Sequence, residues 1–293
     1  MALASEPKAE QVSLEIRPLT IAAGAELSGL DLGRPLAPAE VDGVHGALLD
    51  HGVVFFRDQP VTPDQQVAFA RNFGRVPKVP DSMFRVHPDN AYVSVLENDA
   101  DRPPTVNTWH SDYSFAARPD FASILRAVAV PSVGGDTIWV NMTAAYEALP
   151  DRMKHLIDGL TATHDFMHLY ERPFKAYLWE GERHRHMEAA RLEHPPVSHP
   201  VVRTHPETGK KALFVNESFT RHIDGMSDTE GRAILRYLID HIRTPEYQVR
   251  FTWTPGTLAF WDNRSTVHYA VADYHPAHRL MHRVTVLKDE IPV

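Results

Sequence analysis

Three histidines in this chain are each followed two residues later by an aspartate, a spacing that can place two metal ligands together. The three pairs are His87 with Asp89, His110 with Asp112, and His222 with Asp224. Imidazole nitrogens and carboxylate oxygens bind divalent metals such as iron and zinc. Because the chain has 18 histidines, such pairs also arise by chance, so the sequence around each pair must decide among them.

The surroundings of His110 differ from those of the other two pairs. His87 is followed by Pro-Asp-Asn, which is typical of a turn, and His222 leads into a glycine before a helix start. Residues 107–115 (NTWHSDYSF) alternate as a strand does, and side chains two apart on a strand share a face. The spacing therefore favours His110 and Asp112 as two metal ligands, with a His–Asp hydrogen bond in a sheet as the alternative.

A third histidine and two arginines occur together near the C-terminus. His268 follows a strand-like run and a turn, and residues 279–287 alternate so that Arg279 and Arg283 share a face. Two arginines directed into a protein interior need anions to pair with. Their partners could be buried acids such as Asp262 or Asp273. We favour the carboxylates of bound ligands, because the arginines lie beside a candidate metal histidine.

Composition restricts the other possibilities. The chain has no cysteine, which excludes disulfides, thiolate zinc sites and iron–sulfur clusters. Its net charge of −8 argues against a broad nucleic-acid-binding surface but allows a small anionic organic substrate. Since no signal peptide or 18-residue apolar run is found, we expect a cytoplasmic protein that does not enter a membrane.

The expected elements are mainly strands with flanking helices. Pro-rich connections between short strands fit a jelly roll better than an alternating βαβ sheet. We expect a flexible tail over residues 1–10 and a single domain over residues 11–293. Expected strands are 53–58, 91–98, 107–115, 122–130, 136–141, 249–253, 258–261 and 279–287; expected helices are 38–49, one opened by Thr62 at its N-cap, 144–160 and 228–242.

Several longer blocks, in one order along nearly the whole chain, resemble the TauD/TfdA family of iron(II)- and 2-oxoglutarate-dependent dioxygenases. The resemblance is strongest to the members of that family that oxidise taurine. The blocks are WHSDYSF, PSVGGDTIWVN, AAYEALP, HPVVRTHPETGKKALFVNESFT and WDNRSTVHYAVADYHPAHRLMHRVT. So many blocks are far more specific than a single H-x-D pair.

The resemblance implies a double-stranded β-helix, which is a jelly roll, and a role for particular residues. It makes His110, Asp112 and His268 the ligands of Fe(II). It assigns Thr137 and Arg279 to the cosubstrate 2-oxoglutarate, with O2 as the second cosubstrate. It assigns Arg283 to the anionic group of the substrate and places Phe219 and Tyr170 in the substrate pocket.

The implied reaction converts 2-oxoglutarate and O2 into succinate and CO2 while a substrate carbon is hydroxylated. A sulfonate hydroxylated in this way gives sulfite and an aldehyde. Val79, Val106 and Leu169 stand where the taurine-oxidising members carry polar groups. We therefore expect a longer or more apolar anion than taurine: an alkyl or aryl sulfonate, an alkyl sulfate, or a carboxylate such as an aryloxyalkanoate.

Two alternatives from other classes of protein remain open at this point. A zinc hydrolase with the same three ligands leaves Arg279 and Thr137 unexplained, and a non-catalytic jelly-roll binding protein leaves the metal site without a use.

The His- and Arg-rich run 183–194 could be a second metal site, but we favour a solvated helical face or lid. We also expect a homo-oligomer, either a dimer or a tetramer.

Overall fold

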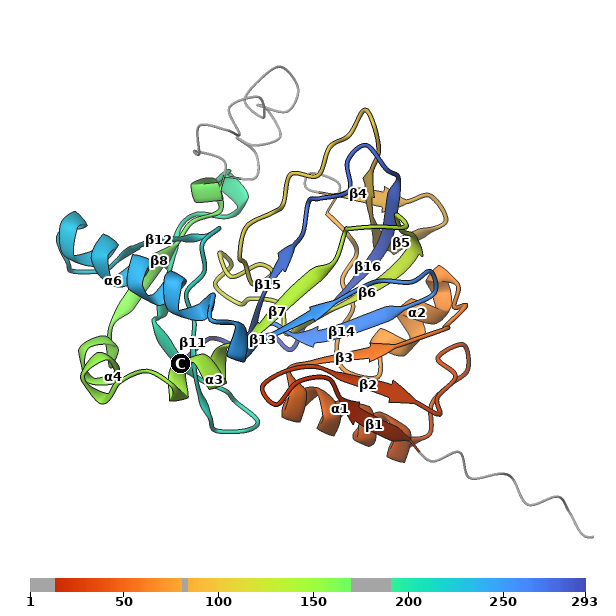
Figure 1. Ribbon diagram of the computed structural model, residues 1–293, viewed down its shortest axis with the longest axis horizontal. Helices are drawn as coiled ribbons and strands as arrows, with labels where there is room; N and C mark the ends of the chain where they lie inside the picture. The colour runs from red at the N-terminus through yellow and green to blue at the C-terminus, as the bar shows by residue number, and fades with distance from the viewer. Residues whose placement is uncertain (1–13, 81–83, 170–190) are drawn as a thin grey trace, which may run out of the picture.

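Two facing β-sheets form the centre of the molecule in a computed structural model, which describes residues 14–80, 84–169 and 191–293 (Figure 1). In spatial order the eight-stranded sheet contains β1 (Glu15–Pro18), β2 (Ala25–Ser28), β3 (Val53–Phe56), β14 (Leu258–Asp262), β6 (Ala122–Ala129), β16 (Arg279–Val286), β5 (Asn90–Asn98) and β4 (Arg85–His87). The facing sheet contains β13 (Gln248–Phe251), β7 (Thr137–Asn141) and β15 (Thr266–Ala270).

The remaining elements flank these two sheets. A three-stranded sheet contains β12 (Thr220–Ile223), β8 (Thr161–His164) and β9 (Val197–Pro200), and β10 (Val202–Thr204) pairs with β11 (Lys211–Leu213). The helices are α1 (Pro38–His51), α2 (Pro63–Ala70), α3 (Met142–Glu147), α4 (Asp151–Ile157) and α6 (Asp228–Ile242), with the 3-10 turns η1 (Phe166–Leu169) and η3 (Pro245–Tyr247). Within the described residues, no helix combines the length and apolar character needed to cross a membrane.

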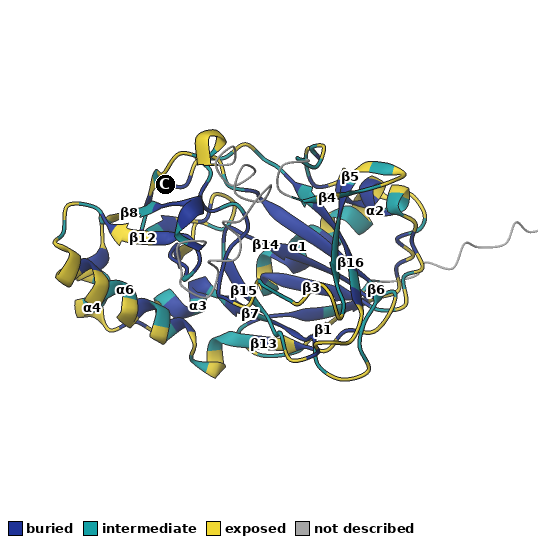
Figure 2. Cartoon of the chain, turned by 90° about the horizontal axis from the view of Figure 1, so that it is seen from above, coloured by how far each residue is buried: buried dark blue, intermediate teal, exposed yellow. Residues whose placement is uncertain are grey.

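The sheets are held together by large buried side chains between them. Phe55 of β3 and Phe251 of β13 stack with ring centroids 3.8 Å apart, and Trp139 of β7 packs edge-on against Phe55. The other face of the large sheet is buried under α1 and α2 (Figures 1 and 2). β3 is therefore buried on both faces, which explains its continuous apolar run.

Most of the expected elements are confirmed. Thr62 caps α2, because its side chain accepts a hydrogen bond from the backbone of Gln65, and α6 has the bounds expected from sequence. The single helix expected over residues 144–160 is wrong: Pro150 separates α3 from α4, since proline has no N–H to continue a helix and its ring clashes with the preceding turn. The expected N-terminal tail lies outside the described residues.

The strand expected over residues 107–115 is also wrong. In this segment only His110 forms a β-bridge, and the chain then turns, with Tyr113 at a φ of 53°. Side chains take the place of a ladder here: Ser111 Oγ donates to the backbone carbonyl of Asn263, and Asn263 Oδ1 accepts from the backbone N–H of Asp112. His110 and Asp112 therefore converge through a turn rather than through strand alternation.

Candidate active site

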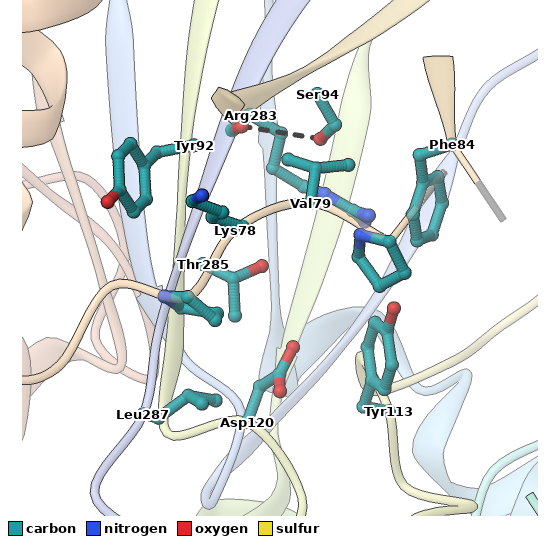
Figure 3. A pocket seen from close by; sticks show the side chains of 12 residues that line it. Lys78, Val79, Phe84, Tyr92, Ser94, Tyr113, Asp120, Arg283, Thr285 and Leu287 are labelled. Carbon is teal, nitrogen blue, oxygen red and sulfur yellow. Dashed lines mark hydrogen bonds between the residues drawn. The ribbon is translucent and has the colours of Figure 1, made fainter. Parts of the chain in front are cut away.

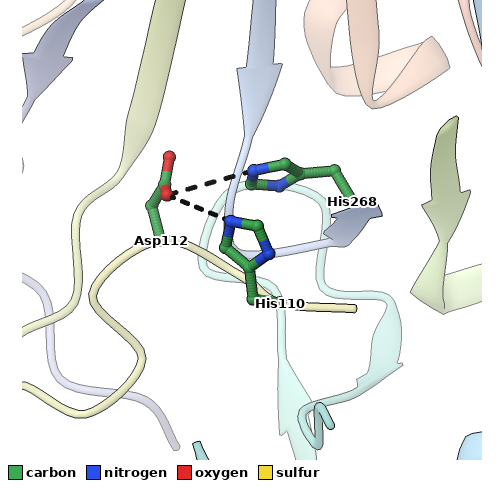
Figure 4. A group of neighbouring side chains, drawn as sticks. All are labelled: His110, Asp112 and His268. Atoms are coloured by element: carbon green, nitrogen blue, oxygen red, sulfur yellow. Dashed lines mark ion pairs between the residues drawn. The ribbon is translucent and has the colours of Figure 1, made fainter. Parts of the chain in front are cut away.

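His110, Asp112 and His268 form a compact buried cluster (Figure 4). One ligand atom from each lies within 4.8 Å of the others, and among the described residues this is the one group of that kind. Asp112 Oδ1 is 3.9 Å from His110 Nε2 and 4.0 Å from His268 Nε2. Three atoms of these types facing one point make a facial metal site that leaves coordination positions open for other ligands.

Backbone pairing brings the two histidines together. The backbones of His110 and His268 form a β-bridge through two hydrogen bonds, with N–O distances of 3.0 and 2.7 Å. His110 Nδ1 lies 2.8 Å from the carbonyl of Thr108, which fits the tautomer that directs Nε2 at a metal. The His268 ring is oriented differently, by packing against Trp139 and Trp261.

Asp112 is held by two contacts to its carboxylate and one to its backbone. Ser123 Oγ of β6 donates to Asp112 Oδ2 at 2.6 Å, and Arg283 Nη1 of β16 donates to Oδ1 at 3.3 Å. The backbone N–H of Asp112 bonds Asn263. Sequence reasoning missed Ser123 altogether, because a lone serine in an apolar strand gives no sign of a bond to a residue on another segment.

The charges of the cluster suit a divalent metal. Burial favours the neutral acid, but Arg283, His268 and His110 together outweigh it and lower the pKa of Asp112 to about 2. Burial, together with His110, lowers the pKa of His268 to about 3. At neutral pH the aspartate is ionised and the imidazole of His268 is neutral, which are the forms that bind a metal. The residues present therefore fit iron(II).

The cluster opens into a cavity of about 160 Å³, which we call the iron cavity. It is lined by Phe84, Leu96, Val106, His110, Asp112, Tyr113, Phe115, Leu125, Thr137, Phe166, Leu169, Phe219, His268, Ala270, Arg279 and Arg283. The expected residues Thr137, Arg279, Arg283 and Phe219 thus lie around one space with the metal cluster. Tyr170 and most of the run 183–194 lie outside the described residues.

Two of these side chains, Thr137 and Arg279, have hydrogen-bond donors available for a bound anion. Thr137 Oγ1 accepts a hydrogen bond from Trp253 Nε1 at 3.0 Å, so its own hydroxyl hydrogen can be donated elsewhere. Arg279 is buried, its Nε has no hydrogen-bond partner, and burial lowers the pKa of its guanidinium. A carboxylate placed between Thr137 and Arg279 would supply the missing acceptor.

The acids that could have neutralised the two arginines are engaged elsewhere. Asp262 pairs with Arg264 at 2.7 Å and with His205 at 3.1 Å. Asp273 accepts from the backbone N–H of Gly135 at 2.8 Å. The salt-bridge alternative is therefore wrong for both Asp262 and Asp273, and the carboxylate nearest Arg283 is the candidate metal ligand Asp112.

The other expected positions are placed as follows. His87 ends β4 and Asp89 lies in the turn that follows, while Asp224, directly after β12, accepts hydrogen bonds from the hydroxyl groups of Thr161, Thr163 and Ser198. Val106 and Leu169 line the iron cavity, but Val79 lines a neighbouring cavity that shares Arg283 with it. Val79 therefore does not lie in the same space as the other two, because residue order does not show which side of a loop faces which space.

A cavity that joins two histidines and one carboxylate to anion-binding side chains defines a class, the mononuclear non-haem iron enzymes. Residues 15–285 match the model of the family described as taurine catabolism dioxygenase TauD, TfdA family. The chain therefore belongs to the TauD/TfdA family, as the resemblance implied.

Curated relatives and a solved structure agree with this. The chain is 37% identical over 274 residues to an alkylsulfatase of Acinetobacter baylyi, covering 93% of this chain and 84% of the relative. It is 37% identical over 296 residues to an alpha-ketoglutarate-dependent sulfate ester dioxygenase of Pseudomonas putida, covering 100% and 94%. The crystal structure of a taurine dioxygenase from Burkholderia xenovorans superposes with a TM-score of 0.80 at 38% identity, covering 96% and 91%.

These findings establish the enzyme class. The chain is an iron(II)- and 2-oxoglutarate-dependent dioxygenase that uses Fe(II), 2-oxoglutarate and O2. The zinc hydrolase and the non-catalytic binding protein are thereby excluded.

Proposed function

We propose that this dioxygenase oxidises the carbon next to the anionic group of a small, largely apolar organic sulfate or sulfonate. The observation that carries the proposal is the position of Arg283: its guanidinium contacts Asp112 at 3.3 Å while the rest of that side of the cavity is apolar. A substrate anion paired with Arg283 would place its neighbouring C–H bond beside the metal ligands.

In this proposal the three clustered residues, His110, Asp112 and His268, hold Fe(II). Arg279 and Thr137 hold the distal carboxylate of 2-oxoglutarate, because a planar guanidinium and a hydroxyl donor suit a carboxylate. The buried Nε of Arg279 and the donor-ready hydroxyl of Thr137 support this assignment.

When bound, the iron with 2-oxoglutarate and O2 supplies an oxidant that replaces one substrate C–H by C–OH, yielding succinate and CO2. Arg283 orients the anion, and the aromatic walls keep water away from the reacting carbon. A hydroxyl placed on the carbon of a sulfate ester makes the C–O bond to sulfate break, giving an aldehyde and hydrogensulfate. The same step on a sulfonate breaks the C–S bond and gives an aldehyde and sulfite.

The apolar wall favours a longer substrate over taurine. Val106, Phe115, Phe166, Leu169 and Phe219 offer a hydrocarbon chain or ring contact worth about 25 cal/mol per Å² buried. The ammonium group of taurine would lose water there without gaining a carboxylate in return, apart from Asp112, which Arg283 and the metal engage.

The names of the relatives favour a sulfate ester as the substrate and also suggest a second candidate substrate. The two relatives at 37% identity are named for alkyl sulfate and sulfate ester substrates, whereas a Burkholderia relative at 35% identity is named for 2,4-dichlorophenoxyacetate. A carboxylate would pair with Arg283 as well as a sulfate does, so an aryloxyalkanoate is the second candidate.

We also propose that the two facing sheets form the double-stranded β-helix, or jelly roll, of a single domain. The alternation of chain segments between the sheets, with β6 and β14 opposite β7 and β15, supports this topology. The homo-oligomer and the cytoplasmic location expected from sequence stay predictions, which size-exclusion chromatography and cell fractionation would check.

A competition assay tests the substrate proposal. Hexyl sulfate, hexanesulfonate, 2,4-dichlorophenoxyacetate and taurine are supplied at equal concentration with iron(II) and 2-oxoglutarate, and aldehyde, sulfate and sulfite are measured. We expect hexyl sulfate to be consumed first and taurine last. Faster use of taurine would contradict the role given to the apolar wall.

The role of Arg283 has its own control. Arg283→Ala should remove the preference for hexyl sulfate over the uncharged 1-hexanol, while Arg250→Ala, an exposed arginine on β13, should leave it unchanged. Equal preference in Arg283→Ala and the unaltered enzyme would place the substrate anion elsewhere.

A further inference from the structure

A second cavity of about 180 Å³ lies beside Arg283 and does not include the metal cluster in its lining, and we call it the outer cavity (Figure 3). It shares Phe84, Tyr113 and Arg283 with the iron cavity, so the two spaces meet at these three side chains. The guanidinium of Arg283 lies over the Phe84 ring, 4.4 Å from its centroid. A molecule bound at Arg283 can therefore reach either cavity.

The outer cavity is lined by apolar and by polar side chains, and the polar ones include Lys78, Ser94, Asp120, Arg283 and Thr285. Apolar contacts are offered by Pro77, Val79, Pro80, Phe84, Tyr92 and Leu287. Ser94 also lines the cavity, but its hydroxyl is used, since it donates to the backbone carbonyl of Arg283 at 3.3 Å. Such a surface suits a hydrocarbon chain with a polar group at one point along it.

Asp120 is the polar group without a protein partner. Its side chain points into the outer cavity (Figure 3), only 6% of the residue is exposed, and its Oδ2 has no hydrogen-bond partner. No ion pair reaches it from the part of the chain that the structure describes. Burying a carboxyl group without a partner costs free energy, so this position is unfavourable to the fold unless a ligand completes it.

We propose that the outer cavity binds the end of the substrate remote from its anionic group, and that Asp120 selects a substrate chain carrying a hydroxyl group. This inference rests on the proposed function and deepens it. The anion stays on Arg283, the first carbons of the chain lie in the iron cavity against its apolar side chains, and the rest of the chain passes Phe84 and Tyr113 to end at Asp120.

A hydroxyl fits this position better than a charged group does. Burial and the nearby charge of Asp112 raise the pKa of Asp120, and Arg283 opposes this rise only in part. A hydroxyl can donate to a carboxylate and accept from a protonated carboxyl, so it pairs with Asp120 in both states. An ammonium group would meet the positive charges of Arg283 and of Lys78, which also lines this cavity. A second carboxylate at the end of the chain would meet Asp120 itself, and Lys78 is exposed to solvent rather than buried beside Asp120.

The test uses alkyl sulfates of three to eight carbons, each with and without a terminal hydroxyl. We expect kcat/KM to favour the hydroxylated member by roughly ten- to a hundredfold at the chain length that reaches Asp120, the range for a hydrogen bond to a carboxyl group. Asp120→Leu and Asp120→Ala should bring this ratio to one or below. Asp120→Asn should keep part of it, since an amide still pairs with a hydroxyl.

Stability gives an independent readout. Asp120→Leu removes an unpaired buried carboxyl group, so we expect the melting temperature to be unchanged or raised while hydroxyl selectivity is lost. If the leucine variant does not fold, Asp120→Ala decides in its place. Asp89→Leu, which changes an exposed carboxylate outside both cavities, is the matched control and should alter neither quantity.

The outcomes separate this inference from the proposed function. Turnover of alkyl sulfates with an unchanged hydroxyl ratio in both Asp120→Leu and Asp120→Ala overturns the role of the outer cavity alone. A preference for terminal ammonium over hydroxyl also overturns it. If no alkyl sulfate is oxidised, the proposed function fails, and calorimetric binding of the same compounds to the iron-loaded enzyme then tests Asp120 directly.

Discussion

The iron cavity has a metal end, with the side chains proposed for the metal and the cosubstrate, and a substrate end, with the apolar side chains, and different elements of the fold supply the two. The side chains proposed for the metal and the cosubstrate sit on or beside strands of the two facing sheets: Ser123 on β6, Thr137 on β7, His268 on β15, and Arg279 on β16. The apolar side chains proposed to contact the substrate come mainly from connecting segments and from the turn η1, whereas Arg283 is on β16. The proposed chemistry is thus held mostly by the rigid framework, whereas selectivity for the substrate chain is carried mostly by loops.

A polar network joins those loops. Asn216 Nδ2 donates to Ser114 Oγ at 2.8 Å, and Asn216 Oδ1 accepts from the backbone N–H of Phe219 at 2.9 Å. His164 Nδ1 lies 3.1 Å from the same Ser114 hydroxyl. Because all four residues are buried, this network fixes the position of Phe219 relative to the turn that follows Asp112.

The largest effect is expected at the metal cluster. Replacing His110, Asp112 or His268 with alanine should abolish turnover, because each change removes one metal ligand. Oxygen uptake and bound iron measure the result, and Asp89→Ala is the control, since Asp89 lies in an exposed turn. Full activity with normal iron content in Asp112→Ala would show that the metal lies elsewhere.

The next effect concerns the cosubstrate. Arg279→Ala should raise the 2-oxoglutarate concentration required for half-maximal rate by roughly 30-fold or more, since breaking a buried charge pair costs about 2–5 kcal/mol. Arg279→Lys should recover only part of this, because an ammonium cannot bind a carboxylate through two parallel hydrogen bonds. An unchanged requirement in Arg279→Ala would move the cosubstrate to another cation.

The difference between the two ends also explains what the sequence could predict. His110, Asp112, His268, Thr137 and Arg279 lie in the sequence blocks that carry the family resemblance, so the sequence could bring them together as candidates, and they do line one cavity although residues 107–115 are not a strand. The outer cavity could not be foreseen. It depends on how the segments carrying Val79, Asp120 and Arg283 meet, and residues so far apart in the chain leave no periodic signal.

A smaller effect is expected from Ser123, which supports the metal end without being a ligand. Ser123→Ala removes the hydrogen bond to Asp112 Oδ2 and should weaken metal binding by about ten- to a hundredfold, as for other residues that support metal ligands. Equilibrium dialysis against Mn(II) measures this without turnover. Ser265→Ala, in the turn between β14 and β15, is the control, and equal affinity in both variants would contradict the role of Ser123.

At the substrate end, Phe219→Ala should reduce selectivity rather than chemistry. The buried ring contributes apolar contact to the substrate chain, so kcat/KM for hexyl sulfate relative to ethyl sulfate should fall by roughly tenfold. The requirement for 2-oxoglutarate should not change, because Arg279 and Thr137 are untouched. A parallel change in both quantities would mean that the two ends are not independent.

The smallest effect concerns the network behind the substrate end. Burial and the neighbouring His199 lower the pKa of His164 to about 3, whereas an unfolded histidine titrates near 6.5. The unfolded state therefore binds more protons between these values, so the stability that His164 contributes is complete above pH 6.5 and is lost as the pH falls toward 3. Between pH 7.5 and pH 5.5 this loss of stability amounts to about 1.4 kcal/mol.

Urea unfolding of the unaltered protein and of His164→Gln at both pH values measures this loss. On going from pH 7.5 to pH 5.5, the free energy of unfolding of the unaltered protein should fall by about 1.4 kcal/mol more than that of His164→Gln, although the variant is less stable at pH 7.5. Equal losses would mean that His164 does not stay neutral in the folded protein and that the substrate end is not the acid-sensitive part of the site.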